Sequence, residues 1–337
     1  MYAQLMVMLG NAYSAEDVTK QFSIEPTMEQ KLQDKIVEKS EFLGMINVIS
    51  VDEMSGEVIL GYANGPASGR TDTSGDNKRK PRNLLGMESS TYQLHNTDSD
   101  VYITFKTIDI WAKFKDLPTR YTGYVQGRIA NDREIIGWYG EKAEATTNLE
   151  TYPMMQDVNK GWMQIMREKK PGNIIVEGVE GSGVIKIGKG GDYENLHHAV
   201  ADMKMGIPKY LRNNLIVLVG DELVGEQQVA LYKATGDTPT ENVLVSQATA
   251  LIGGLPWMTP SNFPGRGLVV TTLSNLSIYH QGGSWRRFIK ENPEMNRIDD
   301  FNSRNEGYVV EVLEQFVALE FKDDNIKITR DGGTTWE

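Results

Sequence analysis

The sequence predicts a soluble α/β protein, in which helices and strands mix along one chain of 337 residues. Its composition is that of a folded protein, with 39% hydrophobic and 24% charged residues. The continuous apolar run at 215–219, ended by Gly220, predicts a buried central strand. Apolar residues recur at spacings of four and seven between 121 and 143, which predicts one long helix.

The charge and the lack of cysteine exclude several classes of function. The net charge is −11 and the pI is about 5.0, which argues against a broad basic surface for nucleic acid. Without cysteine there are no disulfides, thiolate metal sites or cysteine nucleophiles. No apolar run approaches the ~20 residues that span a bilayer, and the apolar stretch 5–9 lacks the flanks of a signal peptide. We expect no membrane association and folding in the cytosol.

The first 47 residues predict a short apolar opening and then a helix. The helical stretch begins at Pro26, with a stripe made of Met28, Leu32, Ile36 and Leu43. Its other face is polar, so the pattern fits an ordinary surface helix and an arm that packs on a neighbouring subunit equally well.

Residues 48–105 predict a protruding hairpin or loop. Strands are expected at 48–51 and 58–60, and an alternating strand at 101–105 is expected to lead back. Between them, 61–87 is rich in Gly, Ser, Thr, Asp and Asn and carries the basic tip, defined as Lys78, Arg79, Lys80 and Arg82. So long an excursion is usually functional or disordered, and we favour a functional one.

Residues 106–148 predict helices that Pro118 interrupts. The longer one covers 119–148, with its apolar stripe inward and Arg128, Asp132, Arg133 and Glu134 outward. Gly127 and Gly137 each weaken it by about 1 kcal/mol relative to alanine, so tertiary packing must hold it.

Residues 151–275 predict alternating helices and strands. Helices are expected at 154–168, 193–205 and 222–234, and strands at 184–187, 215–219, 243–245 and 268–270. Residues 253–257 and the prolines that follow predict a rigid loop.

Residues 276–337 begin with a strand at 276–279 and a basic turn at 285–287. The stretch 308–321 fits a strand and a helix equally well by periodicity, and 329–337 is expected to be loose.

A search for catalytic, cofactor and metal sites assigns no residue to any of them. The histidines are His95, His197, His198 and His280, and the adjacent pair cannot ligate one metal by helical spacing. The glycine clusters 181–183 and 188–191 flank a strand but lack the P-loop and Rossmann spacings, so turns are the better interpretation.

Carboxylate pairs such as Glu177 and Glu180, or Asp299 and Asp300, are common in any acidic protein and carry little information. The basic tip has three interpretations: a phosphate site, a solvated loop end, or a contact with an acidic neighbour. These features favour assembly over catalysis.

Ordered segments over nearly the whole chain resemble the major capsid proteins of P2-like tailed bacteriophages. The segments are FSIEP at 22–26, KTIDIWA at 106–112, MQDV at 155–158 with GW at 161–162, IGKGGDY at 187–193, IGGLP at 252–256, LSNLSIY at 273–279, RR at 286–287, ENP at 291–293 and YVVE at 308–311. No single segment would suffice, and their shared order carries the resemblance.

The resemblance implies an α+β fold of the Hong Kong 97 type. It implies an N-terminal arm at 1–47, of which 1–21 is a candidate cleaved propeptide, and an extended loop at 48–105 that lies over an adjacent subunit. A peripheral domain at 106–154 would carry the long spine helix, an axial domain would cover 155–275, and 276–337 would return to the peripheral domain and a tail. Strands are then favoured within 308–321.

The implied function is self-assembly, without enzymatic activity, into the icosahedral head shell around double-stranded DNA. Implied partners are other copies in pentamers and hexamers, an internal scaffolding protein and maturation protease, the portal protein, and DNA bound without sequence specificity. The expected location is the virion, after assembly in the bacterial cytoplasm. An encapsulin-like shell and a soluble α/β enzyme with a phosphorylated ligand at 188–192 are the alternatives.

Overall fold

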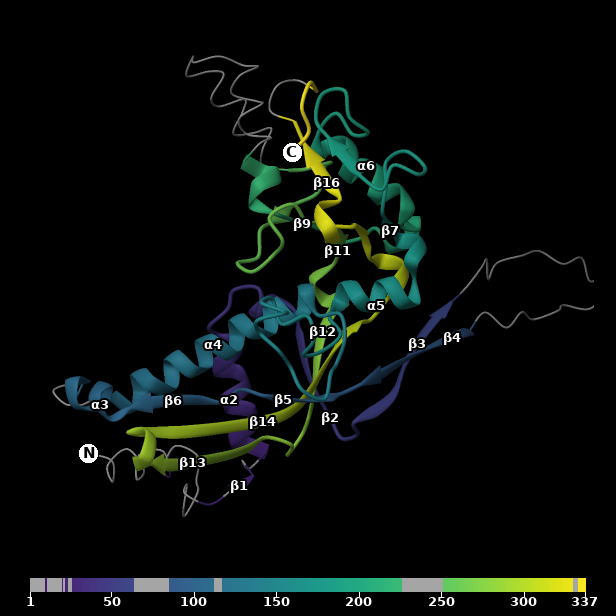
Figure 1. Cartoon of the computed structure of the whole chain (residues 1–337). Helices are drawn as coiled ribbons and strands as arrows, with labels where there is room; N and C mark the ends of the chain where they lie inside the picture. The colour runs from purple at the N-terminus through teal and green to yellow at the C-terminus, as the bar shows by residue number, and fades with distance from the viewer. Residues whose placement is uncertain are drawn as a thin grey trace, which may run out of the picture.

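The computed structural model describes residues 10, 20, 22–23, 26–63, 85–111, 117–225, 251–329 and 333–337. Figure 1 shows two packed regions and a long hairpin that runs away from both. One region is built on a seven-stranded sheet and the other on a five-stranded sheet.

The seven-stranded sheet is organised around β14 (Arg297–Val310). On one side, β12 (Leu276–Gln281) and β13 (Arg286–Asn292) pair with it in turn, and on the other side β5 (His95–Asp98) and β6 (Val101–Thr104) do the same. The outer strands are β2 (Asn47–Val51), parallel to β12, and β1 (Phe22–Ser23), antiparallel to β13.

Helices cover one face of this sheet. They are α2 (Pro26–Val37), α3 (Phe105–Trp111), the long α4 (Leu117–Tyr139) and α5 (Trp162–Lys169). Figure 1 shows α4 running along β14. Leu32 and Ile36 of α2 are buried with Ile129 and Ile136 of α4, so α2 contributes its apolar stripe to the core of its own chain.

The five-stranded sheet has the order β10 (Trp257–Met258), β9 (Ile216–Val219), β11 (Leu268–Thr271), β15 (Val317–Leu319) and β7 (Ile174–Ile175). Its second core includes α6 (Leu196–Gly206) and the small pair β8 (Ile185–Ile187) and β16 (Ile326–Ile328). The side chains at 217–219 are fully buried, so the predicted buried strand is confirmed.

The protruding hairpin consists of β3 (Ser55–Ala63) and β4 (Leu85–Gln93), paired in register from Ser55 with Gln93 to Ala63 with Leu85. A protruding hairpin is therefore confirmed, but the predicted returning strand is wrong. Residues 101–104 form β6 within the large sheet, because they pair with β14. The basic tip lies outside the described residues.

Several predicted helix ends are wrong for reasons of packing. The helix that begins at Pro26 ends at Val37, and Leu43 is buried in a separate 3-10 turn, Leu43–Met45. The long helix ends at Tyr139 rather than 148, because the amides of Glu141 and Lys142 donate to the Gln156 carbonyl instead of continuing the helical hydrogen bonds. The next helix begins only at Trp162, eight residues after the predicted start at 154.

The C-terminal part also corrects two predictions. The expected basic turn is a strand, because Arg286 and Arg287 lie in β13. Residues 308–310 and 317–319 are strands, as the family resemblance implies, and a 3-10 turn at Leu313–Gln315 separates them. The tail, which was expected to be loose, is held at its end by two backbone hydrogen bonds between Ile328 and Glu337. The strand expected at 243–245 and most of the helix expected at 222–234 lie outside the described residues.

Candidate functional site

The root of the hairpin is anchored to the large sheet by aromatic and charged side chains. The Tyr92 ring meets the Tyr279 ring edge-on, with centroids 5.2 Å apart, and the Tyr279 hydroxyl donates to Glu311 at 3.0 Å. Tyr92 also lies over Gly56, where an added Cβ would be 2.7 Å from the tyrosine oxygen. These contacts fix the direction in which β3 and β4 leave the body.

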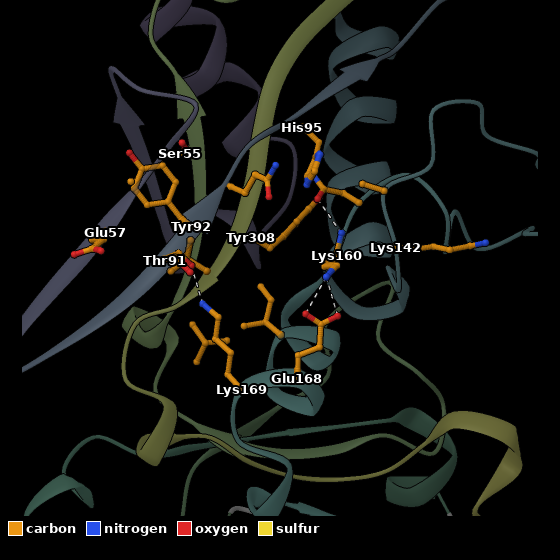
Figure 2. Close-up of a pocket in the computed structure, with 17 residues that line it drawn as sticks. Ser55, Glu57, Thr91, Tyr92, His95, Lys142, Lys160, Glu168, Lys169 and Tyr308 are labelled. Atoms are coloured by element: carbon orange, nitrogen blue, oxygen red, sulfur yellow. Dashed lines mark hydrogen bonds and ion pairs between the residues drawn. The ribbon is translucent and has the colours of Figure 1, made fainter.

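A groove of about 710 Å³ opens beside this root. Figure 2 shows its walls: the first residues of β3 and the last of β4, part of β14, helix α5, and the loop that follows α4. Lys169 crosses it and donates to the Thr91 carbonyl at 2.7 Å, while Lys160 donates to Glu168 at 2.9 Å. The groove is therefore polar at its rim, and the hydrogen bond from Lys169 joins its α5 wall to its β4 wall.

Buried charges join α2, α4 and β14. The Glu306 carboxylate accepts hydrogen bonds from Arg133 Nε at 2.9 Å and from Arg304 Nε and Nη2 at 2.8 and 2.9 Å. Arg133 Nη1 donates to Gln33 of α2 at 2.8 Å, and Tyr308 donates to the Arg133 carbonyl at 2.9 Å. All three charged side chains are 0–1% exposed. We call Arg133, Arg304 and Glu306 the buried charge cluster.

The electrostatics of this cluster do not suit acid–base chemistry near neutral pH. Burial opposes ionisation of Glu306, but the charges and hydrogen bonds of the two arginines outweigh it and lower its pKa to about 2. For His280, burial and then repulsion by Arg133 lower the pKa to about 4. A catalytic acid or base works best with a pKa near the operating pH. The buried charge cluster and His280 are therefore better suited to a structural role than to catalysis.

Two further ion pairs link the elements. Arg287 of β13 holds Asp300 of β14 through two hydrogen bonds of 2.9 and 2.6 Å, and Tyr121 of α4 donates to the same carboxylate at 3.2 Å. Arg167 of α5 holds Glu320 after β15 through bonds of 2.7 and 2.5 Å. Because bidentate pairs fix orientation as well as distance, the second pair fixes how the two sheet regions meet.

The four histidines lie on three separate elements, β5, α6 and β12, and only His197 and His198 are neighbours. His197 Nδ1 accepts from the Gly253 amide at 3.1 Å, and the His198 ring meets Tyr193 edge-on, so the adjacent pair faces different neighbours. Within the described residues, no group of three or more acidic or histidine side chains could hold a metal ion. No helix among these residues is long and apolar enough to cross a membrane.

The glycine clusters are turns around β8, as predicted. Four of these glycines have positive φ: Gly181, Gly183, Gly188 and Gly190. The Gly188 amide donates to the Tyr193 carbonyl at 2.8 Å and the Gly191 amide donates to the Gly188 carbonyl at 2.9 Å. These donors are occupied within the chain, unlike the free amides of a phosphate-binding loop.

The carboxylate pairs do not converge. Asp300 pairs with Arg287 while Asp299 pairs with Arg297, because successive residues of a strand face opposite sides. The Glu177 carboxylate accepts from the Gly183 amide at 2.9 Å, and Glu180 is exposed. Sequence reasoning missed the buried charge cluster, whose only sequence signal is the polar alternation at 300, 302, 304 and 306.

Comparisons with known proteins agree over nearly the whole chain. The family model for the phage major capsid protein of the P2 family matches residues 1–321. The capsid proteins of Escherichia phage P2 are 35% identical over 312 residues, which is 89% of this chain and 87% of that one. The major capsid protein of Serratia phage KSP20 is 30% identical over 312 residues, 89% of each chain.

Solved structures give the same picture. A chain from the satellite phage P4 procapsid, in a structure that includes the size determination (Sid) protein, matches with a TM-score of 0.79 at 32% identity, over 98% of this chain and 99% of that one. A capsid chain of an empty GTA particle matches with a TM-score of 0.55 at 14% identity, over 84% and 90% of the two chains, which shows a shared fold.

Proposed function

The chain belongs to the P2 family of phage major capsid proteins, and from this premise we propose how its geometry builds a shell. It has the Hong Kong 97-type capsid fold, and it is a structural component of the virion rather than an enzyme. Its function is self-assembly into the phage head shell. In the proposal, identical copies occupy pentamers and hexamers of an icosahedral shell around double-stranded DNA.

The observation that carries this proposal is the hairpin of β3 and β4. In Figure 1 it extends beyond both sheet regions, with no other described element beside its outer part. A two-stranded ribbon is marginally stable in water by itself, so its surface is expected to be completed by an adjacent subunit. Many such contacts, each weak, multiply through effective concentration in a closed shell.

The proposed division of the chain follows the two sheets only in part, because β15 and β16 lie in the five-stranded sheet region and α5 packs in the core of the large sheet. Residues 1–47 serve as the arm, 106–154 with 276–337 as the peripheral domain and tail, and 155–275 as the axial domain. Within the extended loop proposed for 48–105, the projecting strands are Ser55–Ala63 and Leu85–Gln93, because β2, β5 and β6 pair in the large sheet.

The remaining partners follow from the role of a shell. We propose that an internal scaffolding protein and maturation protease guide assembly in the bacterial cytoplasm, that the portal protein occupies one vertex, and that DNA is enclosed without sequence-specific binding. The net charge of −11 supports weak adhesion to DNA, which packaging needs. Residues 1–21 are proposed to be removed, and intact-mass measurement of mature particles that retain Met1 would reject this.

Negative-stain microscopy of the expressed chain, with and without its scaffolding protein, tests the function. Closed shells are expected, and a monomer that stays compact under both conditions would contradict it. Reversing the basic tip (Lys78, Arg79, Lys80 and Arg82 to Glu) should impair shell formation and leave the far-UV circular dichroism of the monomer unchanged. Normal shells from this variant would show that the tip is merely solvated.

A further inference from the structure

We propose that the groove at the root of the hairpin receives an acidic segment of a second copy of this chain in the shell. The inference deepens the proposed function and rests on it, because the occupant is a neighbouring subunit.

The groove is large enough to hold part of another chain. The groove of about 710 Å³ has room for roughly 20 water molecules, which is enough for a short peptide segment. Its apolar surface comes from Tyr92, Ile165 and Val310, and no segment among the described residues fills it. Figure 2 shows Lys142, Lys160 and Lys169 around its rim.

The groove also carries a net positive charge. Three lysines and two glutamates, Glu57 and Glu168, line the groove, so the lining residues sum to +1 in a chain that carries −11. Lys142 also forms an exposed ion pair with Glu144, which lies outside the lining. Burial and then repulsion by Lys160 lower the pKa of His95. Burial is also the main cause that lowers the pKa of Lys169; the charge of Glu168 raises this pKa, and the charge of Lys160 lowers it. Burial disfavours a charge of either sign, so the preference for a carboxylate over a further cation comes from the three lysines at the rim.

Neighbouring copies of the chain can supply the carboxylate. The chain has 46 acidic residues, and every copy in a shell presents them at high effective concentration. The hairpin leaves the body beside this groove, so a neighbour that the hairpin contacts is held close to it. The same lysines repel the basic tip of another copy, which leaves an acidic segment as the occupant.

Isotope mixing combined with cross-linking tests the inference. Shells are assembled from equal amounts of ¹⁴N- and ¹⁵N-labelled chains and treated with a zero-length carbodiimide, which joins an amine to a carboxylate in direct contact. Mass spectrometry should find mixed-isotope pairs that join Lys142, Lys160 or Lys169 to an Asp or Glu of another copy. If these lysines appear only in same-isotope pairs, such as Lys160 with Glu168, the inference is overturned. If no shells form at all, the proposed function fails first.

A charge-reversal variant gives a second readout. Changing Lys142, Lys160 and Lys169 to Glu should lower the yield of shells at least tenfold, with the circular dichroism of the unassembled subunit unchanged. The matched control changes the exposed Lys31, Lys35 and Lys209 to Glu, which alters the net charge equally. Equal yields from the two variants would overturn the inference, because the effect would then belong to total charge and not to the groove.

Discussion

Replacing Glu306 with glutamine should lower the free energy of unfolding of the subunit by about 3–5 kcal/mol. The variant keeps the volume of the side chain but leaves Arg133 and Arg304 buried without the anion they share. The pKa gives a similar magnitude. It is about 2 rather than 4.5 for Glu306, and at about 1.36 kcal/mol for each pKa unit this amounts to about 3 kcal/mol.

Urea unfolding of the unassembled subunit at pH 7, followed by tryptophan fluorescence, measures this loss. The control is Glu144→Gln, which breaks a pair with Lys142 whose side chains are 49% and 42% exposed. Exposed pairs contribute about 0–1 kcal/mol. If Glu306→Gln costs no more than this control, the carboxylate does not compensate the two arginines and the reasoning is refuted.

The same carboxylate fixes the sign of a pH dependence. The pKa of Glu306 is lower in the folded state than its ordinary value of 4.5, so its contribution is complete above about pH 4.5 and is lost as the pH falls toward 2. The stabilities of wild type and Glu306→Gln should therefore converge across that interval. A difference that stays constant down to pH 2 would contradict the assigned pKa.

Other residues give further predictions. Gly137→Ala should destabilise the subunit by about 1–3 kcal/mol, because the new Cβ would lie 2.2 Å from the Trp162 ring. Gly127→Ala on the same helix meets nothing within 4 Å and should stabilise by about 0.5–1 kcal/mol; thermal melts that rank the two in the reverse order would reject this packing. Because burial and Arg133 lower the pKa of His280 to about 4, stability should fall by up to about 3 kcal/mol between pH 6.5 and 4. His280→Gln should remove most of that fall in urea titrations, and an unchanged slope would assign it to other groups.

Hydrophobic pattern predicted the elements whose buried residues are apolar. The run that became β9 is buried on both faces, so its sequence alone marks a central strand. The turns around β8 could also be predicted from the sequence, because glycines, which readily adopt positive φ, mark turns locally. In these places, local sequence and tertiary structure impose the same conformation.

The hydrophobic pattern did not predict the elements whose buried side chains are polar. Arg133 and Glu134 were expected to face outward on the long helix, but both are buried, because Glu306 pairs with the first and Ser40 and Asn262 donate to the second. Partners separated by roughly one hundred residues or more cannot be read from a window of a few turns. The strand β14 was missed for the same reason, since its inward side chains at 300–306 are polar.

Local pattern also cannot determine where backbones touch. The long helix stops at Tyr139 because the amides of Glu141 and Lys142 donate to Gln156, in the segment before α5. The returning strand of the hairpin, LGMESSTYQ, carries few β-branched residues, and its pairing with β3 defines it. Both features depend on segments that are distant in sequence.

The alternation of inward and outward side chains along β14 permits only one pairing register for this strand. Ile298, Asp300, Asn302, Arg304 and Glu306 all point inward and are at most 2% exposed. A shift of one residue in the pairing register turns every side chain of a strand to the opposite face. Such a shift would bring Phe301 inward and would leave Arg133 without its counter-ion. A subunit with this wrong register would lose the buried ion pairs of β14, so it would be far less stable than a correctly folded copy available for the shell.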